Sequence, residues 1–112
     1  LKQFDTALTH FQKALNIYEQ NNRCVHRDHA YTRHNLGKLY AMRHDYPEAL
    51  FNYHKSLELF QINYPQNHPT MGTIYCSIGA VYVHMEEFQD GLHYYAAAYS
   101  IFSERLPKNH RD

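Results

Sequence analysis

Apolar side chains recur along the chain at intervals of three and four residues, the spacing of one face of an α-helix. In one such stretch, Leu36, Leu39 and Tyr40 fall on the same side of a helix, and Leu50 and Tyr53 begin the next apolar stripe. The full pattern predicts helices at roughly 2–19, 29–43, 47–62, 70–85 and 89–104. We therefore expect an all-α chain.

Residues at the predicted helix ends agree with these boundaries. Asp45 is expected to accept a backbone N–H as the N-cap of the helix that follows it, and Pro47 suits a first helical turn. Pro65 and Pro107 are expected to end the two helices that precede them, because proline cannot continue a helix.

The pattern itself repeats after 42 residues. Leu36-Gly37-x-x-Tyr40 returns as Ile78-Gly79-x-x-Tyr82, and the triplet His26-Arg27-Asp28 returns two periods later as His110-Arg111-Asp112. A fixed period of this length is typical of stacked helical repeats. It divides the chain into a truncated repeat with its second helix and connector (1–26), two full repeats (27–68 and 69–110) and the start of another (111–112).

Glycines recur at one phase of the repeat. Gly37 and Gly79 stand inside predicted helices, where glycine costs about 1 kcal/mol relative to alanine. We expect them to allow close helix crossing, with the large aromatic residues packed opposite small ones. The eleven tyrosines and six phenylalanines are accordingly read as core and repeat-interface residues.

Composition narrows the classes of function. Eleven Lys and Arg balance eleven Asp and Glu, so no basic surface for nucleic acid or an anionic membrane is expected. No apolar run approaches the ~20 residues of a membrane span, and no secretory leader is recognised. Cys24 and Cys76 do not form a disulfide framework, which favours thiols in a reducing compartment and a cytoplasmic location.

Ten histidines raise the question of a metal site. His26-x-x-His29, with His34 nearby, is a weak signal, because zinc needs three or four converging ligands. His26 shares its phase with His68 and His110, so helix capping is the favoured role and no metal or cofactor is expected. Four other histidines are expected at exposed or turn positions; they are His10, His44, His54 and His93. The stability or association of the protein is expected to change as histidines titrate near pH ~6.5.

No catalytic constellation stands out. Glu86-Glu87 is expected in a turn, and Cys76-Ser77 within a helix, without the neighbours that an acid–base pair or an activated nucleophile needs. We therefore expect a protein that is not an enzyme.

The repeat resembles a known family. A Leu-Gly-x-x-Tyr helix (Leu36, Gly37, Tyr40), followed by Ala49 and then an aromatic residue at Tyr53, is similar to the tetratricopeptide repeat. The 42-residue period and the connector Pro65-Gln66-Asn67-His68-Pro69 resemble the kinesin light chain class of that repeat. The resemblance implies a right-handed superhelix of antiparallel helix pairs, whose concave face is lined by the first helix of each repeat.

In this family the concave face commonly binds extended peptides. The register of the resemblance implies Asn35 as a clamp for a peptide backbone and Lys38 as a partner for a carboxylate, with Tyr31 and His34 adding contacts. Met42 lies at the same face. In the second repeat the corresponding positions are Thr73, Cys76, Ser77, Ala80 and His84. The alternative interpretation is a polar face that is simply solvated.

We thus expect a scaffold that binds an extended segment of a protein partner in its groove. Two other hypotheses stay open: a regulatory or self-associating segment of a larger, possibly enzymatic, protein, and metal-dependent assembly through His26, His29 and His34. Apolar surface at the ends of the repeat array is expected to favour self-association.

Overall fold

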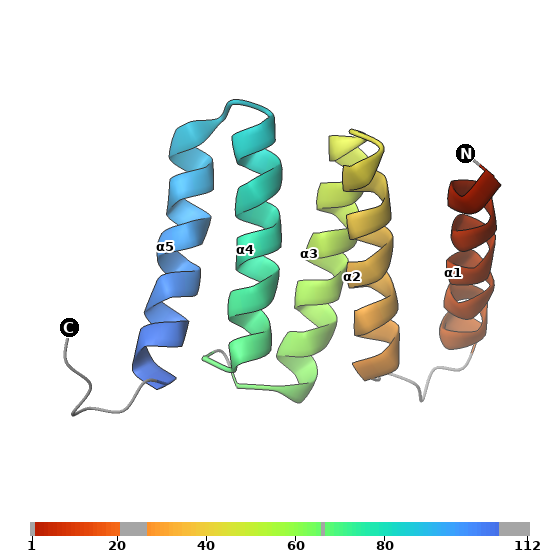
Figure 1. The fold of residues 1–112 in the computed structure, drawn as a ribbon. Coiled ribbons are helices and arrows are strands. Elements are labelled where there is room, and N and C mark those ends of the chain that lie inside the picture. Colours follow the sequence, from red (N-terminus) through yellow and green to blue (C-terminus); the bar gives the residue numbers. More distant parts are fainter. Residues whose placement is uncertain (1, 21–26, 66, 106–112) are drawn as a thin grey trace. The chain divides into compact units, whose positions relative to one another are not determined.

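The computed structural model describes residues 2–20, 27–65 and 67–105, and these form five α-helices. The chain divides into two compact units, Leu1–Tyr64 and Pro65–Asp112, and each is described by itself (Figure 1). The predicted all-α class is confirmed. Each helix lies within two residues of its predicted bounds, the usual uncertainty of helix ends.

The first unit contains α1 (Lys2–Gln20), α2 (Arg27–Met42) and α3 (Tyr46–Asn63). The antiparallel helices α2 and α3 form a tightly packed pair, and α1 packs against α2 (Figure 1). The buried core of the α2–α3 pair contains Leu36, Tyr53 and Phe60. A buried hydroxyl also joins the two helices, since Ser56 Oγ donates a 2.8 Å hydrogen bond to the carbonyl oxygen of Ala30.

The second unit contains α4 (Pro69–His84) and α5 (Phe88–Arg105), which are packed side by side in antiparallel directions. His68 caps α4, because its Nδ1 accepts a hydrogen bond from the backbone N–H of Thr70 at 3.1 Å. The capping role expected from the connector phase is therefore confirmed for His68. Its counterparts His26 and His110 lie outside the described residues.

The turns that join the two helices of each pair lie 42 residues apart and have the same backbone conformation. Asp45 N donates to Tyr40 O at 2.9 Å in the first turn, and Glu87 N donates to Tyr82 O at 2.8 Å in the second. The preceding residue has a positive φ in both turns, 63° at His44 and 64° at Glu86. Two sequences with different turn residues thus adopt one backbone path.

Three glycines lie where helices approach closely. A Cβ built on Gly37 would stand 2.6 Å from Cδ1 of Tyr53, and one built on Gly91 would stand 3.1 Å from the carbonyl oxygen of Gly79. A Cβ on Gly79 would lie 3.2 Å from Cδ1 of Tyr95. The expected pairing of small residues with large aromatic ones is confirmed in both helix pairs.

Two local predictions are wrong. Asp45 occupies the N-cap position of α3, but its side chain makes no capping hydrogen bond, because its backbone (φ −92°, ψ 76°) departs from the extended geometry of a usual N-cap. His54 is half-buried rather than solvated, whereas His10, His44 and His93 are exposed as expected. Pro107, expected to end α5, lies outside the described residues.

Candidate functional site

One stripe of exposed side chains runs along α2. Tyr31, Asn35, Lys38 and Met42, called the α2 stripe below, are spaced by four, three and four residues and are all exposed. Tyr31 has 46% of its surface exposed and Met42 has 77%. A ring, a carboxamide, a cation and a thioether therefore face solvent from one rigid helix.

The two polar members offer complementary chemistry. The Asn35 carboxamide has both donor and acceptor capacity, and a peptide backbone needs both. Lys38 is exposed, and the ion pairs found among the described residues do not include it. Its ammonium group is therefore available to an external carboxylate.

Tyr31 and His34 are held by aromatic contacts with α3. The ring of Tyr31 meets Phe60 edge to face, with centroids 4.9 Å apart, and Phe60 is fully buried. His34 lies against Tyr53 with centroids 5.3 Å apart. These contacts limit the movement of both side chains, so that a ligand on this face would meet a preformed surface.

His34, predicted to add contacts on the binding face, does not titrate near pH ~6.5 as the histidines were expected to. Burial lowers its pKa from 6.5 to about 4, and the positive charge of Lys38 adds to the effect. At neutral pH the imidazole is therefore uncharged. Its contribution at the edge of the α2 stripe is a neutral ring rather than a cation.

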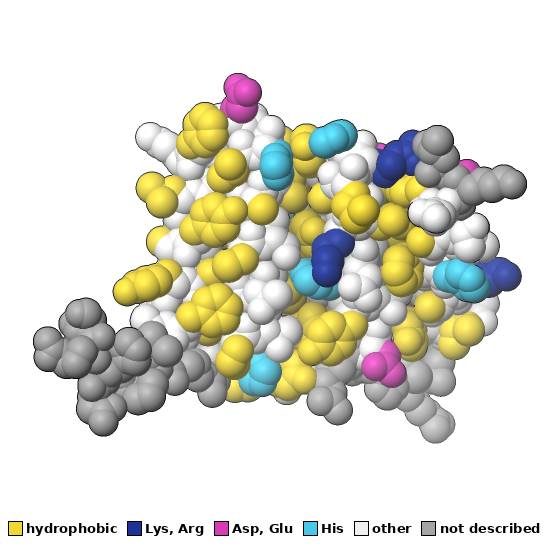
Figure 2. Space-filling view, in the orientation of Figure 1, with side chains coloured by type: hydrophobic (Ala, Val, Ile, Leu, Met, Phe, Trp, Pro, Cys, Tyr) yellow, Lys and Arg dark blue, Asp and Glu magenta, His cyan; other side chains and the backbone are white. Residues whose placement is uncertain are grey.

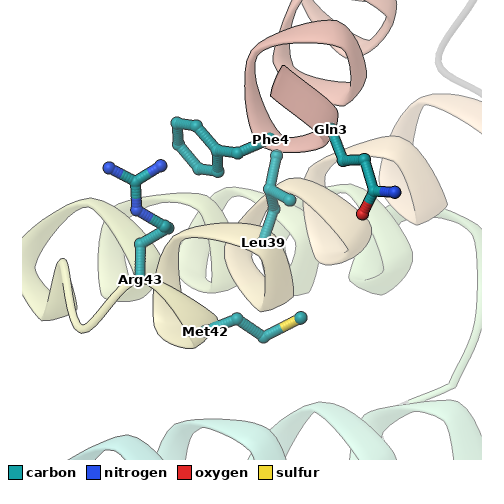
Figure 3. Close-up of a pocket in the computed structure, with 5 residues that line it drawn as sticks. All are labelled: Gln3, Phe4, Leu39, Met42 and Arg43. Carbon is teal, nitrogen blue, oxygen red and sulfur yellow. The ribbon is translucent and has the colours of Figure 1, made fainter. Parts of the chain in front are cut away.

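A pocket of about 300 Å³ opens between α1 and α2, beside the C-terminal end of the α2 stripe (Figure 3). Its lining residues come from both helices and from the turn after α2; they are Gln3, Phe4, Leu39, Met42 and Arg43. Met42 belongs both to the stripe and to the pocket. This volume is at the lower end of the range for ligand pockets.

The chemistry of this pocket is mainly apolar with a cationic rim. The Arg43 guanidinium carbon lies 4.1 Å from the centre of the Phe4 ring, and Phe4 also meets Tyr40 edge to face at 6.0 Å. Sequence reasoning missed this pocket. Phe4 and Arg43 are far apart along the chain, and only the repeat phase could have indicated that α1 and the end of α2 lie side by side.

A polar network centred on Arg33 was also missed. Arg33 donates one hydrogen bond to Asn52 Oδ1 and forms an ion pair with Glu19 Oε2, each at 3.0 Å. Asn52 is buried and donates to the carbonyl oxygen of Glu48 at 2.9 Å. Arg33 thereby connects α1, α2 and α3, and it stabilises the helix that carries the α2 stripe.

The predicted residues of the second repeat lie on α4, in the other unit. Thr73 and His84 are exposed, while Ser77 is half-buried. The Ser77 hydroxyl donates to the carbonyl oxygen of Thr73 at 3.2 Å, and Thr73 Oγ1 donates to that of Pro69 at 3.4 Å. Both hydroxyl protons are thus used within α4. Cys76 and Ala80 are half-buried, and burial raises the pKa of the Cys76 thiol.

No group of three or more histidine, cysteine or acidic side chains is placed to hold a metal ion in the described parts of the chain. His29 stacks on Tyr18 of α1, with centroids 5.2 Å apart, whereas His34 faces Tyr53 of α3. Within residues 2–20, 27–65 and 67–105, no helix has the length and apolar character needed to cross a membrane.

Comparison with known proteins agrees with the fold. Searches of curated proteins and of solved structures found no match. A family model described as tetratricopeptide repeat matches residues 1–62, which include α1, α2 and nearly all of α3. Repeats of this family generally mediate protein–protein interaction. With more than half of its length matched and helix pairs that repeat with one geometry, the chain belongs to the tetratricopeptide repeat family.

Proposed function

We propose that this protein is a binding scaffold, without catalytic activity, that holds an extended segment of a protein partner along α2. The observation that carries the proposal is the α2 stripe, four exposed side chains on one face of a helix that is fixed by packing on both sides. From Tyr31 to Met42 the helix rises about 16 Å. An extended peptide covers that length with about five residues.

The stripe and the pocket define the peptide chemistry. Asn35 binds the peptide backbone through paired donor and acceptor groups, and Lys38 binds an acidic side chain. The pocket between α1 and α2 takes an apolar side chain next to Met42. The preferred segment is therefore extended, with an apolar residue and an acidic residue close together. In the second unit, the family resemblance implies Thr73, Ser77 and His84 of α4 as the corresponding peptide-binding positions.

Selection from a library of random linear peptides tests the proposal. Peptides enriched on the natural chain should lose binding to a variant carrying Asn35→Ala and Lys38→Ala. A matched control removes the same two residue types from α3, through Asn63→Ala and Lys55→Ala, and should keep binding. No enrichment, or enrichment that is indifferent to the stripe changes, would overturn the proposal.

A second candidate function is that of a self-associating or regulatory segment of a larger protein. It is favoured by large apolar side chains on α5, since Leu92 and Tyr99 are 69% and 72% exposed. Sedimentation equilibrium separates the two candidates. A scaffold for peptides remains monomeric and binds peptide, whereas a self-associating segment forms oligomers and binds none.

A further inference from the structure

Met42, the last residue of α2, joins the two features on which the proposed function rests. It is the final member of the α2 stripe, and it is one of the residues that line the pocket between α1 and α2. In Figure 3 the side chains of Met42 and Arg43 leave the end of α2 in different directions, so each forms a different part of the pocket lining. A peptide bound as proposed above contacts the Met42 thioether.

The Met42 thioether is open to solvent. Its exposed fraction, 77%, is the largest of any large apolar side chain in the described parts of the chain. The other two methionines are less accessible, since Met85 is 36% exposed and Met71 is fully buried in α4. A dissolved oxidant reaches a thioether only where solvent reaches it, so Met42 is expected to react first.

Basic side chains stand close to Met42 along the helix. Lys38 lies four residues earlier on the same face, and a helical side chain leans toward the turn that precedes it. Figure 2 shows hydrophobic side chains and Lys or Arg side chains close together over α2. An oxygen added to the Met42 sulfur therefore has a cationic hydrogen-bond donor one turn away.

We propose that Met42 is an oxidation site, and that its conversion to the sulfoxide weakens the binding of a peptide along α2; the second part rests on the proposed function. The oxidant is a peroxide. The sulfur lone pair attacks one oxygen of hydrogen peroxide, the O–O bond breaks, an S–O bond forms and water leaves. The sulfur loses two electrons and the peroxide gains them, so the reaction needs no other partner.

Oxidation changes the stripe and the pocket together. The part of the pocket wall that Met42 supplies becomes polar, so an apolar peptide side chain must displace water from the sulfoxide. The sulfoxide oxygen also accepts a hydrogen bond from Lys38, which draws that ammonium group away from an acidic residue of the peptide. The fold is preserved, because a side chain that is 77% exposed contributes little to the core.

The first measurement needs no peptide. The natural chain is treated with hydrogen peroxide and then with dithiothreitol, which reverses the disulfide and sulfenic acid products of Cys24 and Cys76. Mass spectrometry of the digested protein should find sulfoxide first at Met42, more slowly at Met85, and not at Met71 while the chain is folded. Oxidation of either other methionine as fast as that of Met42 would overturn the assignment of the site.

The second measurement uses a peptide selected on the natural chain that contains neither methionine nor cysteine. Oxidation should weaken its binding by about tenfold, because a polar group is then desolvated at the interface without full hydrogen bonding. Met42→Leu should bind the peptide and resist peroxide, and Met42→Gln, which imitates the polar sulfoxide, should bind weakly without peroxide. Met85→Leu is the matched control and should stay as sensitive as the natural chain. Circular dichroism checks that all variants fold.

The outcomes separate this inference from the proposed function. Equal affinity before and after oxidation of Met42 would overturn the inference and leave the proposed function standing. If no library peptide binds the unoxidised chain, the proposed function and the control of binding both fail, and the first measurement still decides whether Met42 is the oxidation site.

Discussion

Replacing Gly37 by alanine tests the close packing of α2 on α3. Alanine gains about 1 kcal/mol of helix propensity over glycine. The added Cβ, however, would stand 2.6 Å from Cδ1 and 2.7 Å from Cε1 of Tyr53. Tyr53 is only 3% exposed, so its ring has no room to move away. Overpacking of this kind costs about 1–3 kcal/mol, and we expect the free energy of unfolding to fall by about 1 kcal/mol net.

The same substitution one period later provides the matched control. A Cβ on Gly79 would meet Cδ1 of Tyr95 and the carbonyl oxygen of Gly91 at 3.2 Å each, so a shift of a few tenths of an ångström by the 37% exposed Tyr95 ring and by the backbone of α5 relieves both contacts and offsets the gain in helix propensity. Gly79→Ala should therefore be close to neutral. Urea unfolding followed by circular dichroism at 222 nm measures both variants.

A double-mutant cycle isolates the contact. In a Tyr53→Leu background the ring is absent, so Gly37→Ala should become neutral or stabilising. If Gly37→Ala stabilises the natural chain, or costs the same in both backgrounds, the account of helix crossing at Gly37 is refuted.

Three further predictions concern the first unit and the turns. Arg33→Ala should lower the free energy of unfolding in urea by about 2–3 kcal/mol, because it leaves Asn52 Oδ1 buried without its donor. Glu19→Ala should lower it by less than about 1 kcal/mol, because Glu19 is exposed, and equal losses would contradict this account of the Arg33 network. The folded-state pKa of His34, about 4, lies below its ordinary 6.5, so its stabilising contribution is complete above pH 6.5 and is lost as the pH falls toward 4. After allowance for partial exposure, the free energy of unfolding should be about 1 kcal/mol lower at pH 5.5 than at pH 7.5 in the natural chain, and the difference should be much smaller in His34→Gln. The same difference in both chains would show that His34 is not its source. Glu86→Gly should raise the Tm, because the backbone strain of about 1–2 kcal/mol that it relieves at φ 64° is larger than the about 0.5–1 kcal/mol of chain entropy that glycine adds to the unfolded state. Glu87→Gly should lower the Tm, because φ is not positive at residue 87 and there is no such strain to relieve.

The helices were predictable because their apolar positions follow the helical period, and the 42-residue recurrence assigned equivalent roles to distant residues. The recurrence predicted close helix crossing at Gly37, and the structure places the Tyr53 ring against it. The capping of α4 by His68 was predicted in the same way. The left-handed residue at His44 was not, because histidine carries no turn signal comparable to glycine or asparagine.

The candidate site was predictable in part. The register of the family resemblance put Tyr31, Asn35 and Lys38 on one face of a helix, and all three are exposed. It did not identify Arg33 as a link between three helices, because the partners of an arginine are known only when Asn52 and Glu19 are placed around it. The lowered pKa of His34 likewise depends on burial beside Tyr53, which residue type alone does not report.

The most direct test of the binding proposal is an NMR titration of the isotope-labelled chain with a peptide selected from the library. The account predicts chemical-shift changes concentrated at Tyr31, Asn35, Lys38 and Met42 and at the residues lining the pocket between α1 and α2. It also predicts that Asn35→Ala with Lys38→Ala abolishes these changes. Changes confined to α5, or equal binding by the variant, would show that the α2 stripe is not the site.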